Sequence, residues 1–332
     1  MNFLIIGLGS MGKRRTRNLI SLKQSKIIGY DINPKRRQEF EKKYNLPTLS
    51  SLRNINFTNY TALIISTHPS FHLKYIKAAI KNKINCFIEA SIVNDDLIIH
   101  EIKKIKDNSL VYAPSCTMRY FHMPSTVKKI VKSNSLGKIL YVNYHTGQYL
   151  PDWHPWENIK DFYVSKKSTG GCREIVPFEL NWIIDIFGYP KKVINSYKNK
   201  ISKIDANIDD IYNFSLLHQK NLLSQITIEV LSRPKATRNL TVVGEKGKII
   251  FNQDENIFKA HMVKKNIDFS IKKLKTEKNY TYPEQPYVNE MNDFINAIKS
   301  KNKKPFPTNF KDDLKLLKLL KKIEQKTKTS VS

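Results

Sequence analysis

The chain has 332 residues, of which 57 are lysine or arginine and 29 are aspartate or glutamate, so its formal net charge is +28. Its length suits two domains, and a hydrophobic fraction of 40% supplies enough apolar side chains for substantial cores. The basic residues are spread along the chain without a nucleic-acid-binding module, and no apolar run approaches the roughly 20 residues that cross a bilayer, so we expect neither a nucleic-acid partner nor a membrane partner.

The first 31 residues show the order of elements that binds a dinucleotide. An apolar run at 3–6 predicts a buried strand, and the sequence G-L-G-S-M-G at 7–12 is followed by a helix-like segment and a second strand at 26–30. The three glycines permit a tight turn, a close approach of the backbone to a pyrophosphate, and close packing of the helix on the strand. The residues of this turn that we expect to bind the cofactor are Gly7, Gly9, Ser10, Met11 and Gly12.

The second strand ends at Asp31, about 20 residues after the glycines, where a carboxylate accepts hydrogen bonds from the adenine ribose. Its charge repels a 2′-phosphate, so NAD is the predicted cofactor, while the three basic residues at 35–37 keep NADP open. The sequence D-I-N-P also fits a helix start, with Asn33 as N-cap and Pro34 at the first helical position. The two interpretations of Asp31 are compatible.

Strands alternate with helices up to about residue 120. The expected strands lie at 47–49, 61–66, 85–89 and 110–114, and the expected helices lie at 35–44, at 73–81 and before residue 105. The run at 61–66 is continuously apolar, as in strands that are buried on both faces of a parallel sheet. This alternation predicts a doubly wound parallel sheet, a Rossmann domain, over residues 1–120, with its ligand at the carboxyl ends of the strands.

Beyond residue 120 the alternation ends. A helix at 125–133, a strand at 138–147 and a helix at 173–187 precede a largely strand-like region from 193 to 271, and helices at 287–299 and 310–324 close the chain. Successive strands with tight turns favour an antiparallel sheet. We therefore expect residues 121–332 to form an α+β domain with a large, mostly antiparallel open sheet, which binds the substrate.

The three cysteines at 86, 116 and 172 are far apart and form no C-x-x-C motif. They predict reduced thiols in a cytoplasmic protein. The first eleven residues lack the basic region and cleavage site of a signal peptide.

Several further short segments occur in an order that is typical of one protein family. They are S-T-H-P at 66–69 with His72, E-A-S at 89–91, R-Y-F at 119–121, L-G-K-I at 136–139, V-G-E-K-G-K-I at 243–249, and Tyr287 with Glu290 and Phe294. Together with the glycine turn, they resemble the Gfo/Idh/MocA family, the relatives of glucose-fructose oxidoreductase and inositol dehydrogenase. The resemblance implies hydride transfer at a sugar or polyol carbon, and self-association as a dimer or tetramer through the open face of the second sheet.

The resemblance also places cofactor-binding candidates at the ends of the strands. They are Ser66, Thr67, His68, His72, Glu89 and Arg119. Of the two histidines, we expect His68 to contact the cofactor loop and His72 to make a hydrogen bond at a helix start.

The usual catalytic residues of the family are missing. The family has a lysine after the glutamate of the fifth strand, where this chain has Ala90, and an Asp-x-x-x-His on a later helix. The alignment places Ile175 and Glu179 near that Asp and His, or Glu174 at the acidic position after a shift of one residue. A carboxylate in an apolar pocket can have its pKa raised towards neutrality and accept a hydroxyl proton, so Glu174 and Glu179 are catalytic candidates.

The alternative for both glutamates is a favourable interaction with the helix dipole. Arg173, however, opposes that dipole in the first turn, so we expect it to bind the substrate.

The loop at 149–157 is a second candidate wall for the substrate. Trp153 and Trp156 offer flat faces for a sugar ring, and Asp152, His154 and Glu157 offer hydrogen bonds. We expect Tyr149, Asp152 and Trp153 to bind the substrate, and His154 is a candidate to replace the missing catalytic histidine. The alternative is a structural loop packed on its own aromatic residues. No metal site is expected, because the histidines show no short ligand spacing.

These observations predict an NAD(P)-dependent oxidoreductase acting on a carbohydrate, namely a sugar, a sugar phosphate or a nucleotide sugar. The alternative is a catalytically silent sensor that binds the dinucleotide and regulates a partner, since the loss of acid–base groups removes a factor of about 10² to 10⁴ in rate.

Overall fold

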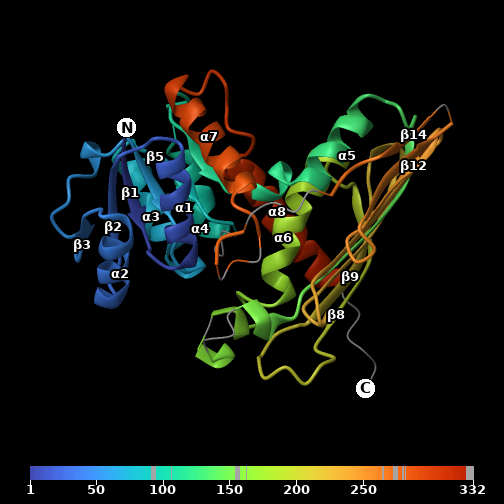
Figure 1. The fold of residues 1–332 in the computed structure, drawn as a ribbon, viewed down its shortest axis with the longest axis horizontal. Helices are drawn as coiled ribbons and strands as arrows, with labels where there is room; N and C mark the ends of the chain where they lie inside the picture. The colour runs from blue at the N-terminus through green and yellow to red at the C-terminus, as the bar shows by residue number, and fades with distance from the viewer. Residues whose placement is uncertain are drawn as a thin grey trace. The chain divides into compact units, whose positions relative to one another are not determined.

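The structure, a computed structural model, describes residues 1–90, 95–105, 107–153, 158–161, 163–263, 265–271, 276–278, 280 and 282–326 (Figure 1). It divides into two compact units. The first comprises Met1–Tyr120 with Leu274–Leu317, and the second comprises Phe121–Lys273 with Lys318–Ser332.

The first unit contains a six-stranded parallel sheet in the order β3-β2-β1-β4-β5-β6. Its strands are β1 (Asn2–Ile6), β2 (Lys26–Tyr30), β3 (Thr48–Leu49), β4 (Ala62–Ile65), β5 (Asn85–Ile88) and β6 (Tyr112–Pro114). Its helices are α1 (Ser10–Ser21), α2 (Pro34–Tyr44), α3 (His72–Lys81), α4 (Asp95–Lys103) and α7 (Gln285–Lys299). The order 3-2-1-4-5-6 is that of a Rossmann fold, so the predicted doubly wound sheet is confirmed.

Alternate residues of β1 enter two different cores. Phe3 and Ile5 belong to one hydrophobic cluster, while Leu4 and Ile6 belong to another. Because successive side chains of a strand point to opposite faces of the sheet, this division shows that helices cover both faces.

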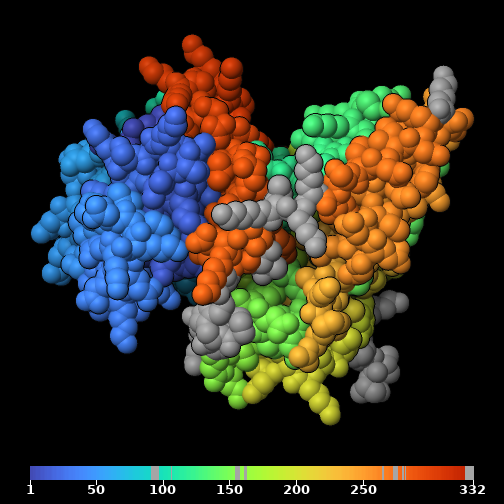
Figure 2. Space-filling view, viewed as in Figure 1, coloured from blue at the N-terminus to red at the C-terminus, as the bar shows by residue number. Residues whose placement is uncertain are grey.

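Residues 274–317 differ from the sequence-based division, which assigned them to the second half of the chain. Helix α7 packs on α1, and its Met291 and Phe294 are fully buried in the same cluster as Phe3. Figure 2 shows the red-orange residues of this return segment against the blue N-terminal residues. The apolar face of α7 therefore completes the core of the Rossmann unit.

The second unit contains an eight-stranded sheet in the order β14-β13-β12-β11-β7-β10-β9-β8. Its strands are β7 (Ile139–Gly147), β8 (Lys192–Asn199), β9 (Ile211–Leu217), β10 (Leu223–Glu229), β11 (Thr237–Gly244), β12 (Gly247–Asn252), β13 (Ile257–Met262) and β14 (Lys265–Asp268). Neighbouring strands are antiparallel except for β7 and β10, which confirms the expected mostly antiparallel sheet.

Two helices, α5 (His122–Lys132) and α6 (Cys172–Phe187), belong to the second unit, and α8 (Phe310–Lys326) starts in the first unit and ends in the second. Leu316, Leu319, Leu320 and Ile323 of α8 are buried, as their spacing predicts. Among the described residues, no helix has the length and apolarity needed to cross a bilayer.

Candidate functional site

The glycine turn after β1 is shaped by close backbone contacts. Gly7 has a φ of +93°, and a Cβ built on it would lie 2.5 Å from the carbonyl oxygen of Ser66. A Cβ on Gly12 would lie 1.8 Å from the carbonyl oxygen of Gly7. Both positions therefore require glycine. A Cβ on Gly9 would meet, within 4 Å and among the described residues, the Nη1 atom of Arg36 at 4.0 Å, so the backbone at Gly9 is open to a ligand.

Asp31 connects the end of β2 to this turn. Its Oδ2 accepts a hydrogen bond of 2.8 Å from the Leu8 amide, and its Oδ1 accepts one of 2.9 Å from the Asn33 amide. Asn33 in turn caps α2 through its side chain, with Pro34 at the helix start. The predicted helix start is confirmed, and the buried carboxylate of Asp31 lies beside the glycine turn.

Ser66 and Thr67 follow β4 beside the same turn. The Ser66 Oγ and Thr67 Oγ1 atoms are buried and have no hydrogen-bond partner in the described part of the chain. Buried polar atoms are rarely left unpaired, so two free hydroxyls at this sheet edge fit a polar ligand.

The two histidines that follow organise this loop. Nδ1 of His68 accepts a hydrogen bond of 3.1 Å from the Ser70 amide at the start of a short 3-10 helix, Pro69–Phe71. Nε2 of His72 donates a hydrogen bond of 3.0 Å to the Thr67 carbonyl. Both histidines thus make hydrogen bonds at helix starts, His68 at the 3-10 helix and His72 as the first residue of α3.

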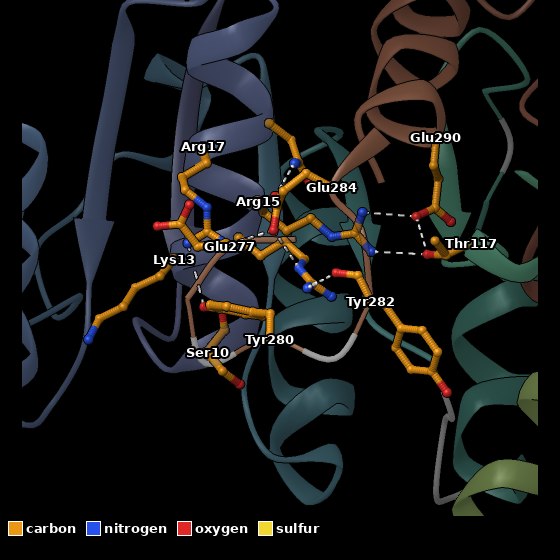
Figure 3. Close-up of polar contacts among 12 residues, drawn as sticks. Ser10, Lys13, Arg15, Arg17, Thr117, Glu277, Tyr280, Tyr282, Glu284 and Glu290 are labelled. Carbon is orange, nitrogen blue, oxygen red and sulfur yellow. Dashed lines mark hydrogen bonds and ion pairs between the residues drawn. The ribbon is translucent and has the colours of Figure 1, made fainter. Parts of the chain in front are cut away.

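Glu89, at the end of β5, belongs to a buried ionic cluster. Arg15 of α1 is fully buried and lies 2.6 Å from Oε1 of Glu89 and 2.9 Å from Oε2 of Glu290 on α7. Glu290 also accepts hydrogen bonds from the hydroxyls of Ser115 and Thr117, and Figure 3 shows Arg15, Glu290 and Thr117 together. The cluster fixes the end of β5, where Ala90 replaces the lysine that the resemblance leads one to expect.

A second set of contacts joins α1 to the segment before α7. Arg14, Arg17 and Asn18 all donate to the carboxylate of Glu284. The Tyr280 hydroxyl donates a hydrogen bond of 2.7 Å to the carbonyl oxygen of Ser10, as Figure 3 shows. Internal ion pairs thus balance basic side chains on a helix whose N-terminus follows the glycine turn. Sequence reasoning missed these contacts.

Arg119, another expected cofactor residue, donates a hydrogen bond of 3.2 Å from Nη1 to the carbonyl of Pro307.

In the second unit, Glu174 lies in the first turn of α6. Its Oε1 accepts a hydrogen bond of 2.6 Å from the hydroxyl of Tyr163, whereas its Oε2 is buried and has no hydrogen-bond partner among the described residues. Burial raises the pKa of Glu174 to about 7, and the Tyr163 hydrogen bond opposes that rise. Glu174 can therefore both accept and release a proton near neutral pH.

The loop before α6 sets the geometry of this pair. The hydroxyl of Thr169 donates a hydrogen bond of 2.9 Å to the Tyr163 carbonyl. A Cβ on Gly170 would lie 1.8 Å from the carbonyl oxygen of Val164, so the glycine lets the loop pack on the short 3-10 helix Tyr163–Ser165.

Glu179 lies one turn further along α6 and has a different environment. Its side chain is buried, its Oε2 accepts hydrogen bonds of 2.7 Å from the Tyr144 hydroxyl and from Nε1 of Trp182, and its Oε1 lies 2.6 Å from Nη2 of Arg238. Both oxygens are occupied by contacts that anchor α6 to β7 and β11. This geometry gives Glu179 a structural role, although through these side-chain contacts rather than through the expected helix-dipole interaction, because Glu179 lies beyond the first turn of α6.

Arg173 pairs with α8. Its Nε lies 2.7 Å from Oε1 of Glu324, and its Nη1 donates to the carbonyl of Ser168. It lines a hollow of about 500 Å³. The other lining residues are Lys167, Ser168, Lys198, Asp209, Lys321, Glu324 and Gln325. The pairing with Glu324 explains an arginine in the first turn, and the hollow carries more basic than acidic groups.

The loop at 149–157 is described as far as Trp153. The Arg233 guanidinium lies 4.0 Å above the ring of Tyr149. Nε1 of Trp153 is buried without a hydrogen-bond partner among the described residues, and Asp152 is exposed. His154 lies outside the described residues. In the described ranges, no three His, Cys, Asp or Glu side chains are grouped as metal ligands.

Comparison with protein families decides the relationship. A family model described as "Oxidoreductase family, NAD-binding Rossmann fold" matches residues 1–96, and the "GFO/IDH/MocA C-terminal domain" matches residues 125–250. The chain belongs to the Gfo/Idh/MocA family. The first unit is thus an NAD-binding Rossmann domain, and the family resemblance drawn from the sequence is confirmed.

This Gfo/Idh/MocA chain is similar to a further protein in sequence and to another in fold. An uncharacterized oxidoreductase, YhhX, of Escherichia coli K12 is 24% identical over 218 residues, which cover 63% of this chain and 59% of the relative. An oxidoreductase from Agrobacterium radiobacter, solved with NAD+, L-tartaric acid and magnesium, has 12% identity, a TM-score of 0.84 and coverage of 98% and 96% of the two chains.

Two further solved structures share the fold. Levoglucosan dehydrogenase in complex with NADH has 14% identity and a TM-score of 0.81, with coverage of 98% and 96%. The WlbA dehydrogenase of Bordetella pertussis, in complex with NADH and UDP-GlcNAcA, has 16% identity and a TM-score of 0.79, with coverage of 98% and 95%.

The residues of this Gfo/Idh/MocA protein fit a nicotinamide dinucleotide. Gly9 leaves its backbone open, Asp31 presents a carboxylate at the end of β2, and the Ser66 and Thr67 hydroxyls are free to pair. The N-terminus of α1 follows directly and favours phosphate through its backbone amides and dipole. These residues lie at the carboxyl edge of the parallel sheet, where such ligands bind.

Proposed function

We propose that this protein is an NAD(P)-dependent oxidoreductase that acts on a CH–OH group of a sugar-like substrate, with Glu174 as the proton-transfer residue. The observation that carries the proposal is the Glu174 carboxyl group, whose pKa is about 7 and whose Oε2 is buried and unpaired among the described residues. A residue with such a pKa serves as a base in oxidation and as an acid in reduction.

The proposed chemistry divides between coenzyme and chain. When bound, the coenzyme would supply the hydride acceptor for the alcohol carbon in oxidation and the hydride donor for the carbonyl carbon in reduction. In the oxidation direction Oε2 of Glu174 takes the hydroxyl proton as the carbonyl forms, and in reduction it gives the proton back. Tyr163 keeps Oε1 occupied, so the proton is exchanged at Oε2. Glu174 thereby takes over the role that the family's lysine and histidine normally share.

A sugar-like substrate is supported by Trp153, by the net charge and by the relatives. Trp153 combines a flat ring with an unpaired indole N–H among the described residues, a combination suited to a sugar. The formal net charge of +28 attracts anionic substrates, so we place sugar acids, sugar phosphates and nucleotide sugars ahead of neutral sugars. Levoglucosan dehydrogenase and the WlbA dehydrogenase share the fold, and the latter was solved with UDP-GlcNAcA.

A substrate panel tests the proposal. Neutral sugars, sugar acids, sugar phosphates and nucleotide sugars are incubated with NAD+ or NADP+, and the corresponding ketones with NADH or NADPH, while absorbance at 340 nm is followed. We expect turnover with an anionic sugar, and a loss of about 10²-fold or more in kcat for Glu174→Gln with unchanged coenzyme affinity. The matched control is Glu245→Gln, at an exposed turn between β11 and β12.

Two outcomes contradict the proposal. Tight coenzyme binding without turnover of any panel member in either direction favours the catalytically silent sensor. Full activity of Glu174→Gln would show that a group other than Glu174 transfers the proton.

A further inference from the structure

We infer that Arg233, in the loop between β10 and β11, recognises an anionic group on the sugar, a carboxylate or a phosphate, and so selects charged sugars over neutral ones. The inference rests on the proposed function, because it assigns a specificity-determining contact to the same substrate site. It concerns the second unit alone and does not depend on which residue transfers the proton.

The loop that carries Arg233 is fixed by a buried carboxylate at the end of β10. Oε2 of Glu229 accepts hydrogen bonds of 2.5 Å and 2.9 Å from the amides of Leu231 and Ser232. Oε1 of Glu229 accepts a hydrogen bond from the Ser232 hydroxyl and lies 3.1 Å from Nε2 of His145 on β7. The backbone that leads to Arg233 is therefore held in one conformation by a side chain of the sheet.

Tyr149 holds the guanidinium of Arg233 from the neighbouring loop. Cζ of Arg233 lies 4.0 Å from the centroid of the Tyr149 ring. The Leu150 amide donates a hydrogen bond of 3.2 Å to the Val230 carbonyl, so the loops that follow β7 and β10 lie side by side. An arginine that lies over an aromatic ring still presents the N–H groups at its edge to an anion.

The charge of Arg233 is not balanced within the described part of the chain. Its side chain is exposed, and no described carboxylate forms an ion pair with it. By contrast, Arg173 and Arg238 of the same unit pair with Glu324 and Glu179. Arg233 therefore keeps a positive charge and a planar fork, which can donate two parallel hydrogen bonds to the oxygens of a carboxylate or a phosphate.

The Arg233 loop lies at the end of the sheet where α6 begins. Sγ of Cys172, the first residue of α6, donates a hydrogen bond of 3.4 Å to the carbonyl of Ile228, close to the end of β10. Glu174 follows Cys172 in the first turn of the helix, and Arg233 lies in the loop that follows Ile228. This placement suits a sugar whose ring reaches Glu174 while its anionic group meets Arg233.

A series of glucose derivatives that differ only at carbon 6 tests the inference. D-glucose, D-glucuronate and D-glucose 6-phosphate are titrated by calorimetry into the full chain, with and without NADH. We expect the wild-type protein to bind glucuronate or glucose 6-phosphate at least about tenfold more tightly than glucose. The tighter of these two ligands identifies a carboxylate or a phosphate as the preferred anion.

Three variants assign this preference to one side chain. Arg233→Gln should weaken the binding of the charged sugar by about tenfold or more and change that of glucose by less than about twofold. Arg233→Lys keeps the charge but loses the fork, so it should retain part of the preference. Lys235→Gln removes a charge from an exposed position of the same loop and is the matched control, which should keep the preference within about twofold.

Three results overturn the inference. Equal affinity of the wild type for the three sugars, or binding of none of them, shows that the site selects no anion. An equal loss for glucose and the charged sugar in Arg233→Gln shows that Arg233 supports the loop through Tyr149 instead of binding the anion. An unchanged preference in Arg233→Gln assigns the anion to another cation.

The same variants separate this inference from the proposed function. A preference that depends on Arg233, without turnover of any sugar in the substrate panel, removes the proposed function and leaves the anion contact in place. Turnover of charged sugars that Arg233→Gln leaves unchanged removes this inference alone.

Discussion

The hydroxyl of Tyr163 donates a hydrogen bond of 2.6 Å to Oε1 of Glu174, which makes the two oxygens of that carboxylate inequivalent. Oε2 is buried and has no hydrogen-bond partner in the described ranges. An ionised carboxylate in this position is costly, because burial penalises its charge and a single hydrogen bond offsets that penalty only in part. The pair thus keeps a protonation equilibrium near neutral pH in the first turn of α6.

Replacing Tyr163 with phenylalanine should raise the pKa of Glu174 further. The Tyr163 hydrogen bond lowers the pKa of Glu174 against the effect of burial, so its loss raises that pKa above about 7. The rising limb of the pH profile of kcat/KM for alcohol oxidation should then shift to higher pH. Tyr197→Phe, on the exposed part of β8, is the control. A limb that stays in place or moves to lower pH contradicts the assignment of Glu174 as the base.

The stability of the fold should report the same group without any substrate. The pKa of Glu174 is about 7 in the folded chain, against a usual value of 4.5, so the folded state binds this proton more tightly than the unfolded state. Its contribution to stability is full below about pH 4.5 and is lost as the pH rises through about 7. Glutamine does not titrate. The Tm of Glu174→Gln relative to the wild type should therefore increase between about pH 5 and pH 8 in thermal melts.

A difference in Tm that stays constant over this range shows that Glu174 keeps an ordinary pKa in the folded protein. If the Tm of Glu174→Gln relative to the wild type falls as the pH rises, the pKa of Glu174 is lowered in the folded protein rather than raised.

Glu179→Gln should act on stability far more than on proton transfer. It leaves Arg238, whose side chain is 8% exposed, without its carboxylate at 2.6 Å. Breaking one side of a buried ion pair costs about 3–5 kcal/mol. Chemical denaturation measures this loss, with Asp268→Asn at the exposed Lys259–Asp268 pair as a control that should cost about 0–1 kcal/mol. A stable Glu179→Gln protein that binds coenzyme yet lacks activity would assign catalysis to Glu179 instead.

The contrast between Glu174 and Glu179 shows a feature of the site that cannot be predicted from the sequence. Both are acidic residues of one helix, and the sequence makes both of them candidates. Their difference comes from partners on other elements: Tyr163 precedes the helix, whereas Tyr144 and Arg238 lie on β7 and β11. Long-range pairing of this kind has no signal in residue spacing.

The Rossmann sheet was predictable because its evidence is local. Strand, glycine turn, helix and Asp31 all fall within the first 31 residues, and Gly7 and Gly12 answer close backbone contacts that the structure shows. Arg15, by contrast, pairs with Glu89 and with Glu290, which lie 74 and 275 positions away. The sequence analysis placed residues 274–317 in the second domain for the same reason, because an apolar helix face does not reveal which core it packs into.

Alanine at Gly9 and at Gly12 should have opposite consequences for binding and folding. Gly9 has an ordinary φ of −71°, and the nearest described atom that its Cβ would meet lies 4.0 Å away, so Gly9→Ala should fold normally. The same methyl group occupies the space through which a pyrophosphate approaches the backbone, so NADH affinity should fall about tenfold or more. At Gly12 the Cβ would lie 1.8 Å from the carbonyl oxygen of Gly7, which forces the backbone to shift and should cost about 1–3 kcal/mol of stability or more.

Thermal melts and NADH titrations of both variants separate these effects, because each variant serves as the control for the other. Gly12→Ala should lower the Tm, whereas Gly9→Ala should leave the Tm within about 2 °C of the wild type and weaken binding. Unchanged NADH affinity in a folded Gly9→Ala protein would show that the coenzyme does not pass over this turn. That result would remove the structural basis for placing Asp31 at its adenosine end.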